Sequence, residues 1–181
     1  MERSFLMIKP DGVKRAFVGR IIAKLEDAGL KLQALQLIKP SREIIEKQYP
    51  KDEEWLRTVG GKSLETYKKY GIDPVKEVGT AEPLRIGEMV REWLMEYIIS
   101  GTVVAMVVEG NHAVEVVRKL VGSTIPIFAA PGTIRGDYGM DSPDLANAER
   151  RAVYNLVHAS GSVKEAEYEI SVWFGEKRAT I

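Results

Sequence analysis

Cysteine is absent from this chain of 181 residues, and histidine occurs only twice. The absence of cysteine excludes disulfides and thiolate metal sites, and two histidines alone do not supply the ligands of the common zinc sites. Positive charge is not in excess either, because 26 lysines and arginines balance 26 aspartates and glutamates. This balance argues against binding nucleic acid through bulk charge, and we expect no specific nucleic acid partner.

Long apolar runs are missing as well. The longest, residues 103–108, has the length of a strand and falls far short of the roughly 20 residues that cross a bilayer. The segment before Lys9 contains too few apolar side chains for a secretory signal. The sequence therefore predicts a cytoplasmic protein with no membrane partner.

The order of the hydrophobic patterns predicts one α/β (α+β) domain over residues 1–181. Apolar alternation or continuous apolar segments indicate strands, and apolar residues at helical spacing indicate the helices between them. The order is typical of a ferredoxin-like split β-α-β fold, with a four-stranded, mainly antiparallel sheet and helices packed on one face. The predicted strands are residues 4–9, 30–34, 102–109 and 154–157, and the predicted helices are 18–28, 41–49, about 112–121 and one that starts at 162.

Two stretches interrupt this pattern, at about residues 50–88 and 140–151, and we interpret both as insertions. The first is too long for a loop without structure of its own, so we expect one or two helices in it. In the second, Ser142 followed by Pro143 indicates the start of a helix.

His158 is the residue most able to carry chemistry. A neutral imidazole is nucleophilic near neutral pH, because an unperturbed histidine titrates at about 6.5. The pattern from Ser162 to Glu165 indicates a capping box that opens a helix, and Glu169 follows two turns later. Helical side chains lean toward the N-terminus, so the Glu169 carboxylate can reach an imidazole that lies just before the helix. Taken alone, a histidine at this place is more often a surface or capping residue.

Several cationic residues lie where a phosphate could bind. Lys9 ends the first predicted strand, Arg135 lies in a loop bracketed by glycines, and Arg118 and Thr124 flank a predicted helix end. Taken alone, Lys9 is better explained as a lysine at an exposed strand end, and the Arg135 loop is a weak signal. Arg118 and Thr124 alone can be a solvated helix arginine and a turn threonine. His112 has no partner motif and is interpreted as structural or surface.

One apparent motif is set aside. Gly61, Lys62 and Ser63 resemble the end of a phosphate-binding P-loop, but Leu56 stands where that motif requires glycine.

Four segments, taken together in their order and spacing, resemble the nucleoside diphosphate kinase family. Each segment is ambiguous alone, whereas the combination is specific, and the similarity covers most of the chain outside the two insertions. The segments are residues 5–12 with 18–19, residues 103–110, residues 131–137, and residues 155–160, which continue into 165–170 and 173–174.

The resemblance implies an enzyme, a phosphotransferase that moves the γ-phosphoryl group from a nucleoside triphosphate such as ATP to a nucleoside diphosphate. The transfer is of the ping-pong type, with a phosphohistidine on His158 formed through Nδ1. Glu169 would hold the other ring nitrogen, and Ser160 would support that pair. The nucleotide contacts implied by resemblance are Lys9, Tyr49 and Arg135 at the terminal phosphates, Arg118 and Thr124 at the β-phosphate, Asn155 at the ribose hydroxyl, and Val90 at the base.

The resemblance also implies Mg²⁺ as the cofactor and a homo-oligomer, usually a hexamer in this family. Mg²⁺ is expected to be held mainly by the nucleotide phosphates, without metal-ligating residues from the chain.

The chain departs from the family at three places. Gly161 stands where the family usually has an aspartate, and residues 125–130 are apolar where the family is polar and charged. Val90 stands where an aromatic residue usually stacks on the base.

Two other functions are compatible with a ferredoxin-like chain. One is a non-catalytic module that binds a nucleotide or RNA, although residues 102–109 lack the aromatic side chains on which RNA bases stack. The other is a histidine phosphatase, for which no water-activating base is evident.

Overall fold

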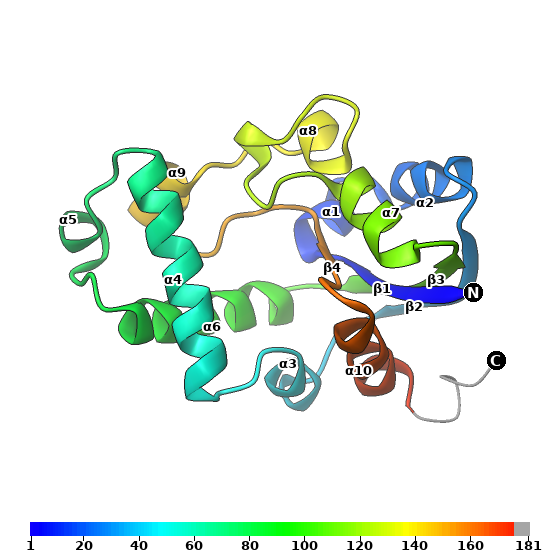
Figure 1. Ribbon diagram of the computed structural model, residues 1–181, viewed down its shortest axis with the longest axis horizontal. Helices are drawn as coiled ribbons and strands as arrows, with labels where there is room; N and C mark the ends of the chain where they lie inside the picture. The colour runs from blue at the N-terminus through cyan, green and yellow to red at the C-terminus, as the bar shows by residue number, and fades with distance from the viewer. Residues whose placement is uncertain (176–181) are drawn as a thin grey trace.

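The computed structural model describes residues 1–175 of the chain. Its centre is a four-stranded sheet in the order β2-β3-β1-β4, and every ladder between these strands is antiparallel. The ferredoxin-like α/β fold is therefore confirmed (Figure 1). The strands are β1 (Glu2–Ile8), β2 (Lys31–Ile38), β3 (Val103–Gly110) and β4 (Val157–Ala159).

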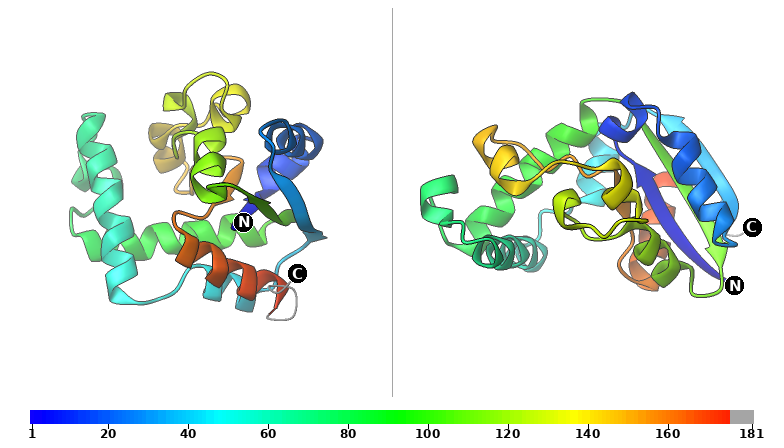
Figure 2. Two further views of the ribbon diagram at one scale, coloured as in Figure 1. Left: turned by 45° about the vertical axis from the view of Figure 1, so that its right-hand side comes forward. Right: turned by 90° about the horizontal axis from the view of Figure 1, so that it is seen from above.

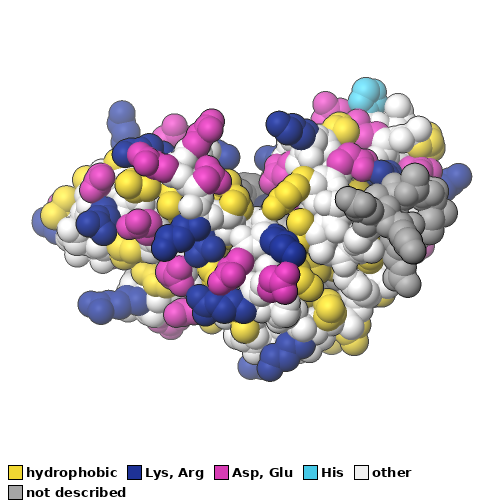
Figure 3. Space-filling model, turned by 90° about the horizontal axis from the view of Figure 1, so that it is seen from below, with side chains coloured by type: hydrophobic (Ala, Val, Ile, Leu, Met, Phe, Trp, Pro, Cys, Tyr) yellow, Lys and Arg dark blue, Asp and Glu magenta, His cyan; other side chains and the backbone are white. Residues whose placement is uncertain are grey.

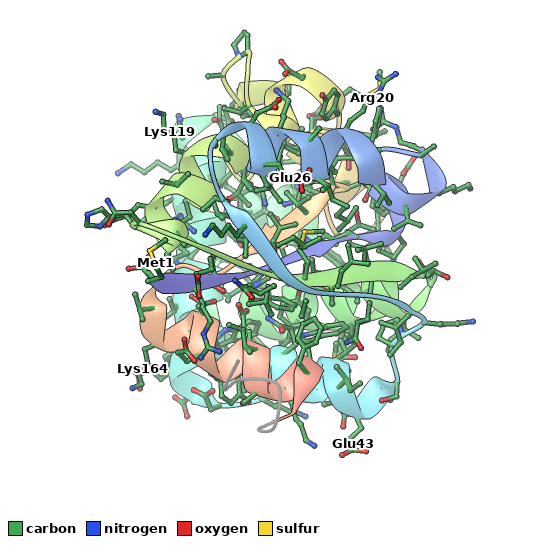
Figure 4. The ribbon with its side chains drawn as sticks, turned by 90° about the vertical axis from the view of Figure 1, so that its right-hand side faces the viewer. Met1, Arg20, Glu26, Glu43, Lys119 and Lys164 are labelled. Carbon is green, nitrogen blue, oxygen red and sulfur yellow. The ribbon has the colours of Figure 1, made fainter. Side chains whose placement is uncertain are left out.

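Helices cover both faces of the sheet, so the expectation of helices on one face was wrong. The reason lies in β1, where side chains alternate between the faces and yet all of Phe5, Leu6, Met7 and Ile8 are fully buried. Figure 4 shows the two layers, with Arg20 and Glu26 on the helix above the sheet and Glu43 and Lys164 on helices below it. An RNA-binding sheet needs central strands with an open face, and β1 and β3 are buried along most of their length.

Each layer has its own hydrophobic core. α2 and α7 pack with Leu6 and Ile8 on one side, whereas α3, α6 and α10 pack with Phe5 and Met7 on the other. The bounds are α2 (Val18–Asp27), α3 (Arg42–Gln48), α6 (Pro83–Ile99), α7 (Ala113–Val121) and α10 (Val163–Phe174).

The last strand was predicted at residues 154–157 but runs from Val157 to Ala159. Leu156 has a left-handed φ of 67°, which interrupts an extended chain just before the strand. Side chains hold the preceding backbone instead, since the Tyr154 N–H donates to Asp141 at 2.6 Å and Arg135 donates to the Asn155 carbonyl at 3.0 Å.

The stretch from residue 50 to 88 contains two helices and the start of a third. α4 (Glu53–Lys69) begins at Asp52, whose side chain accepts from the Trp55 N–H at 2.9 Å. α5 (Pro74–Val78) follows, and α6 begins at Pro83. Ser142 and Pro143 do start a helix, α9 (Pro143–Ala148). The remaining short helices are α1 (Pro10–Lys14), η1 (Pro126–Phe128) and α8 (Ile134–Tyr138).

α4 crosses α6 at one end of the molecule, away from the sheet (Figures 1 and 2). The crossing depends on two glycines that let the backbones touch. A Cβ on Gly60 would lie 1.8 Å from the Pro83 carbonyl oxygen, and one on Gly87 would lie 2.0 Å from that of Leu56. The helices therefore meet backbone to backbone.

Among the helices of residues 1–175, none has both the length and the apolar composition that a bilayer-spanning segment requires.

We predict that Gly87→Ala lowers the free energy of unfolding by about 1–3 kcal/mol, because the added methyl group forces α4 away from α6. The matched control is Gly61→Ala on α4, where a Cβ would meet nothing within 4 Å. Alanine favours a helix over glycine, so the control should be neutral or slightly stabilising. Urea unfolding measures both, and equal effects of the two substitutions would contradict the close contact.

Candidate active site

His158 lies in β4, at one edge of the sheet, opposite Met7 of β1. Its side chain is 17% exposed. The rings of Phe5 and Tyr49 approach it, with centroid separations of 6.1 Å and 6.4 Å. The imidazole is therefore fixed on one side by aromatic rings while part of it remains accessible.

The carboxylate of Glu169 on α10 fixes the other side of the imidazole. Its Oε1 lies 2.5 Å from His158 Nε2, and its Oε2 accepts from the Ser160 hydroxyl, also at 2.5 Å. Burial alone would raise the pKa of Glu169, but the charge of His158 and the hydrogen bonds from His158, Ser160 and Gln48 together lower it. An ionised carboxylate accepts the proton of Nε2, which leaves the lone pair of the neutral ring on Nδ1.

Gln48, at the end of α3, completes this arrangement and was missed in the sequence. Its amide nitrogen donates to Glu169 Oε1, and its amide oxygen accepts from Trp173 Nε1 at 2.7 Å. The indole, which can only donate, thus sets the orientation of the amide. A signal did exist, because Gln48 is a polar residue one helical turn after buried Ile45.

Tyr49 lies beside this group, with its ring edge-on to the imidazole at an interplanar angle of 89°. Arg91 fixes its backbone through a hydrogen bond of 2.8 Å from Nε to the Tyr49 carbonyl. The phenol oxygen is buried and has no hydrogen-bond partner among the described residues. Burial, followed by the charges of Glu169 and Glu165, raises the pKa of Tyr49, so the phenol keeps its proton and remains a donor.

Lys9 lies two residues beyond the β1 residue that faces His158, and it is only 4% exposed. Its backbone N–H donates to the Leu156 carbonyl at 2.8 Å, and its Nζ donates to Asn155 Oδ1 at 2.7 Å. Burial lowers the pKa of Lys9 to about 7; the charge of Arg135 acts in the same direction, and Asp11 opposes it. The ammonium therefore lacks a full counter-charge.

Arg135 is also buried, and it holds three backbone carbonyls. It donates through Nε to Asn155, through Nη1 to Gly122 and through Nη2 to Val157, at 3.0, 3.0 and 2.7 Å. Burial and the nearby charge of Arg118 lower its pKa to about 10. The guanidinium thus ties the loop before it to the backbone that leads to His158.

Arg118 is exposed on α7 and lies near the turn that follows His158. A Cβ added to Gly161 would lie 3.7 Å from Arg118 Nη1 and 2.8 Å from Glu165 Oε2. Glu165 accepts from the Gly161 N–H at 2.8 Å, so its carboxylate binds one residue before the expected capping position at Ser162. The Glu165 carboxylate therefore lies close to the position that a side chain at residue 161 would occupy.

A cavity of about 320 Å³ opens next to these groups. Val90, Thr124 and Asn155 all line it. Asn155 also belongs to the cationic group, because its Oδ1 accepts from Lys9 while its Nδ2 donates to the Thr124 carbonyl at 3.0 Å. The cavity and the cationic group are therefore continuous through one side chain.

The structure thus brings the candidate residues into three adjoining groups. His158, Glu169, Ser160 and Tyr49 form the first; Lys9, Arg135 and Asn155 form the second; and Val90 and Thr124 line the cavity with Asn155. Arg118 is exposed near Gly161, outside these groups. His112 is remote from all three and pairs on the surface with Glu115 at 3.1 Å.

The carboxylates near His158 do not form a ready cage for a metal ion. In the described part of the chain, one group of potential ligands lies here, made of His158, Glu165 and Glu169. Glu169 already accepts from His158, Ser160 and Gln48, and Glu165 accepts from Gly161. The donor set therefore fits Mg²⁺ that arrives bound to phosphates better than a dedicated protein site.

Comparison with known proteins agrees with this geometry. The family model described as nucleoside diphosphate kinase matches residues 2–56 and 87–179. A nucleoside diphosphate kinase of Pyrobaculum aerophilum is 54% identical over 177 residues, which cover 98% of this chain and 97% of the relative. The chain belongs to the nucleoside diphosphate kinase family.

Solved structures agree as well. The crystal structure of an NDP kinase from Pyrobaculum aerophilum superposes with a TM-score of 0.91 at 52% identity and covers 98% of both chains. A transition-state mimic of the Borrelia burgdorferi enzyme with vanadate and ADP gives a TM-score of 0.77 at 32% identity, covering 98% of this chain and 89% of that one. A halophilic enzyme from Halobacterium salinarum in complex with CDP gives 0.66 at 31% identity, covering 98% and 90%.

We predict that Lys9 makes the stability of the ligand-free protein depend on pH. The unfolded lysine binds a proton up to about pH 10.5, whereas the folded one releases it near 7, so stability rises with pH between these values and the gain is lost as pH falls through about 7. The slope is at most about 1.4 kcal/mol per pH unit. Urea unfolding between pH 7 and about pH 9, below the tyrosine range, should show the slope in wild type and its loss in Lys9→Met.

The control for this measurement is Lys14→Met, which removes an exposed lysine from α1, the helix that follows Lys9. A Lys9→Met protein with the wild-type pH dependence would contradict the assignment.

Proposed function

We propose that the chain exchanges a γ-phosphoryl group between nucleoside triphosphates and diphosphates through a phosphohistidine on Nδ1 of His158. One observation carries the proposal: Glu169 lies 2.5 Å from Nε2 of His158, so the nucleophilic lone pair is on the other nitrogen. As a member of its family the chain is a phosphotransferase, and the choice of atoms and residues is our inference.

In the first half-reaction, the Nδ1 lone pair forms a bond to the γ-phosphorus. The bond from that phosphorus to the β,γ-bridging oxygen breaks, and the nucleoside diphosphate leaves with the electron pair. The imidazole becomes cationic, and Glu169 stabilises it through the Nε2–H. In the second half-reaction, a terminal oxygen of another diphosphate attacks the same phosphorus, and the Nδ1–P bond breaks.

The surrounding residues bind and orient the phosphates in this proposal. Lys9, Arg135 and the phenol of Tyr49 face the terminal phosphates, and their placement beside His158 supports this role. Arg118 and Thr124 face the β-phosphate, Asn155 binds the ribose hydroxyl, and Val90 lies at the base. Phosphoryl transfer makes little covalent demand on the protein, so positioned cations are its main contribution.

Mg²⁺ is the proposed cofactor. When bound to the nucleotide, it neutralises charge on the phosphates. The residues of the chain then orient the phosphates on either side and keep the leaving oxygen in line with Nδ1.

We predict that the protein, incubated with Mg²⁺ and ATP labelled in its γ-phosphate, acquires an acid-labile and base-stable label on His158. A chase with unlabelled GDP should transfer the label to GTP, because the phosphohistidine is an intermediate. His158→Ala should take up no label. His112→Ala, which changes the other histidine on the surface, should behave like wild type and serves as the control.

Three outcomes would reject the proposal. They are label that persists in His158→Ala, a folded wild type that takes up no label, and water rather than GDP as the main acceptor. The last would favour a histidine phosphatase.

We also propose a homo-oligomer, a hexamer in the family pattern, which acts in the cytoplasm where nucleotide pools are kept. β2 supports self-association, because it is an edge strand whose outer backbone groups make no backbone hydrogen bond within residues 1–175. Leu32, Leu35 and Leu37 on this strand are 38%, 42% and 64% exposed. Such a row of exposed leucines on a sheet edge is typical of an interface.

We predict that Leu35→Lys combined with Leu37→Lys reduces the mass of the assembly, because two buried interfacial leucines would become charged. Light scattering after size exclusion measures the mass against the 20.2 kDa of one chain. The control is Val75→Lys, which changes a 56% exposed residue on α5. An unchanged mass in the double variant, or a monomeric wild type, would contradict the proposal for β2.

A further inference from the structure

α4 forms one wall of the cavity that contains Val90, Thr124 and Asn155. Three of its polar residues, Lys62, Ser63 and Thr66, line that cavity. All three lie in residues 57–86, between the two segments that the family model matches. The wall is therefore built from a part of the chain that the common family pattern does not describe.

If the phosphates bind beside His158, this cavity adjoins them on the side of Asn155 and offers room for the nucleoside. Asn155 contacts Lys9 through Oδ1 and forms part of the cavity lining. A nucleotide whose phosphates meet Lys9 therefore extends past Asn155 toward α4. The cavity volume of about 320 Å³ is in the range of small-ligand sites. Figure 3 shows, from below, a notch between the part of the molecule that carries α4 and the part built on the sheet.

The walls of the cavity differ in chemistry. α6 contributes apolar surface through Val90 and Trp93, which are three residues apart and so share one helix face. α4 contributes the polar groups of Lys62, Ser63 and Thr66, beside Val59 and Tyr67. Flat apolar surface suits the faces of a base, whereas polar groups suit its edge, so the base edge is expected to point toward α4.

The hydroxyls of the two α4 residues that line the cavity are left as acceptors. Ser63 donates its hydroxyl hydrogen to the Val59 carbonyl at 3.1 Å, and Thr66 donates its own to the Lys62 carbonyl at 2.9 Å. Each oxygen then has lone pairs and no hydrogen left to offer. Lys62, exposed at the edge of the cavity, is the opposite case, since an ammonium can only donate.

A stacked pair of rings fixes the far end of α4 over the loop that carries Thr124. Tyr70, at the end of α4, lies on Phe128 of η1 with ring centroids 3.7 Å apart and an interplanar angle of 8°. Residues 125–130, which are apolar where the family is expected to be polar, are thus packed against the end of α4 through Phe128. This contact and the glycine crossing with α6 hold the wall at both ends.

We propose that α4 reads the base of the bound nucleotide: Ser63 and Thr66 accept from an exocyclic amino group, and Lys62 donates to a ring carbonyl. The proposal rests on the function proposed above and extends it to base selectivity. Adenine has an amino group and no carbonyl, and uracil has carbonyls and no amino group. The two bases therefore separate the two kinds of contact.

The test measures equilibrium binding of ADP and UDP to full-length variants. Thr66→Val removes the acceptor and keeps a branched side chain. It should therefore weaken the binding of ADP by about 2- to 10-fold and leave the binding of UDP unchanged. Lys62→Met removes the donor and keeps a side chain of similar length. It should therefore weaken the binding of UDP by a similar factor and leave the binding of ADP unchanged. Thr58→Val and Lys68→Met, at exposed α4 positions outside the cavity lining, are the matched controls.

Binding of diphosphates requires no phosphoryl transfer, so this test is independent of the labelling of His158. Phosphorylation of His158 by phosphoramidate, a phosphoryl donor that carries no nucleobase, should proceed at the wild-type rate in all variants. Equal weakening of ADP and UDP, or variants that match their controls, would overturn the proposal even in an active enzyme. Circular dichroism establishes that each variant is folded.

Discussion

The hydrogen bond between Glu169 and Nε2 of His158 is the interaction on which the rest of the site depends. It joins the edge strand to α10, and it selects the ring nitrogen that is left to react. Gln48 and Ser160 saturate the same carboxylate, and Trp173 holds Gln48 in turn. The imidazole is therefore oriented by a chain of contacts that extends into the core below the sheet, rather than by one neighbour alone.

The cationic part of the site is organised differently. Lys9 and Arg135 are both buried, and burial lowers both their pKa values. Two such cations next to each other destabilise the ligand-free fold and favour an incoming polyanion, because the phosphates supply the missing counter-charge. If Lys9 and Arg135 bind the phosphates as proposed, the same arrangement costs stability when substrate is absent. Arg135 offsets part of that cost through its bonds to three carbonyls.

Much of this could be predicted from the sequence where spacing along one element fixes the geometry. The cap at Ser162 and the interval to Glu169 lie on a single helix, so the reach of the carboxylate toward His158 followed from helix geometry. Contacts between elements could not be predicted in this way. Gln48 meets Glu169 across 121 residues, and only tertiary packing brings them together. The sequence did not predict helices on both faces, although strands that are apolar on both sides need cover on both. The final strand was misplaced because Leu156 adopts a left-handed backbone conformation.

The three carbonyls held by Arg135 have a consequence for how changes at that position are interpreted. The guanidinium is a planar fork that reaches acceptors in three directions, which a single ammonium cannot reproduce even though its charge is the same. A lysine at position 135 would therefore keep the positive charge but lose the hydrogen bonds that hold the three carbonyls. If Arg135 also binds the phosphates as proposed, an enzyme with another residue at position 135 would be slow for two reasons: weaker substrate binding and a less constrained backbone leading into the edge strand. Kinetics alone would not separate the two.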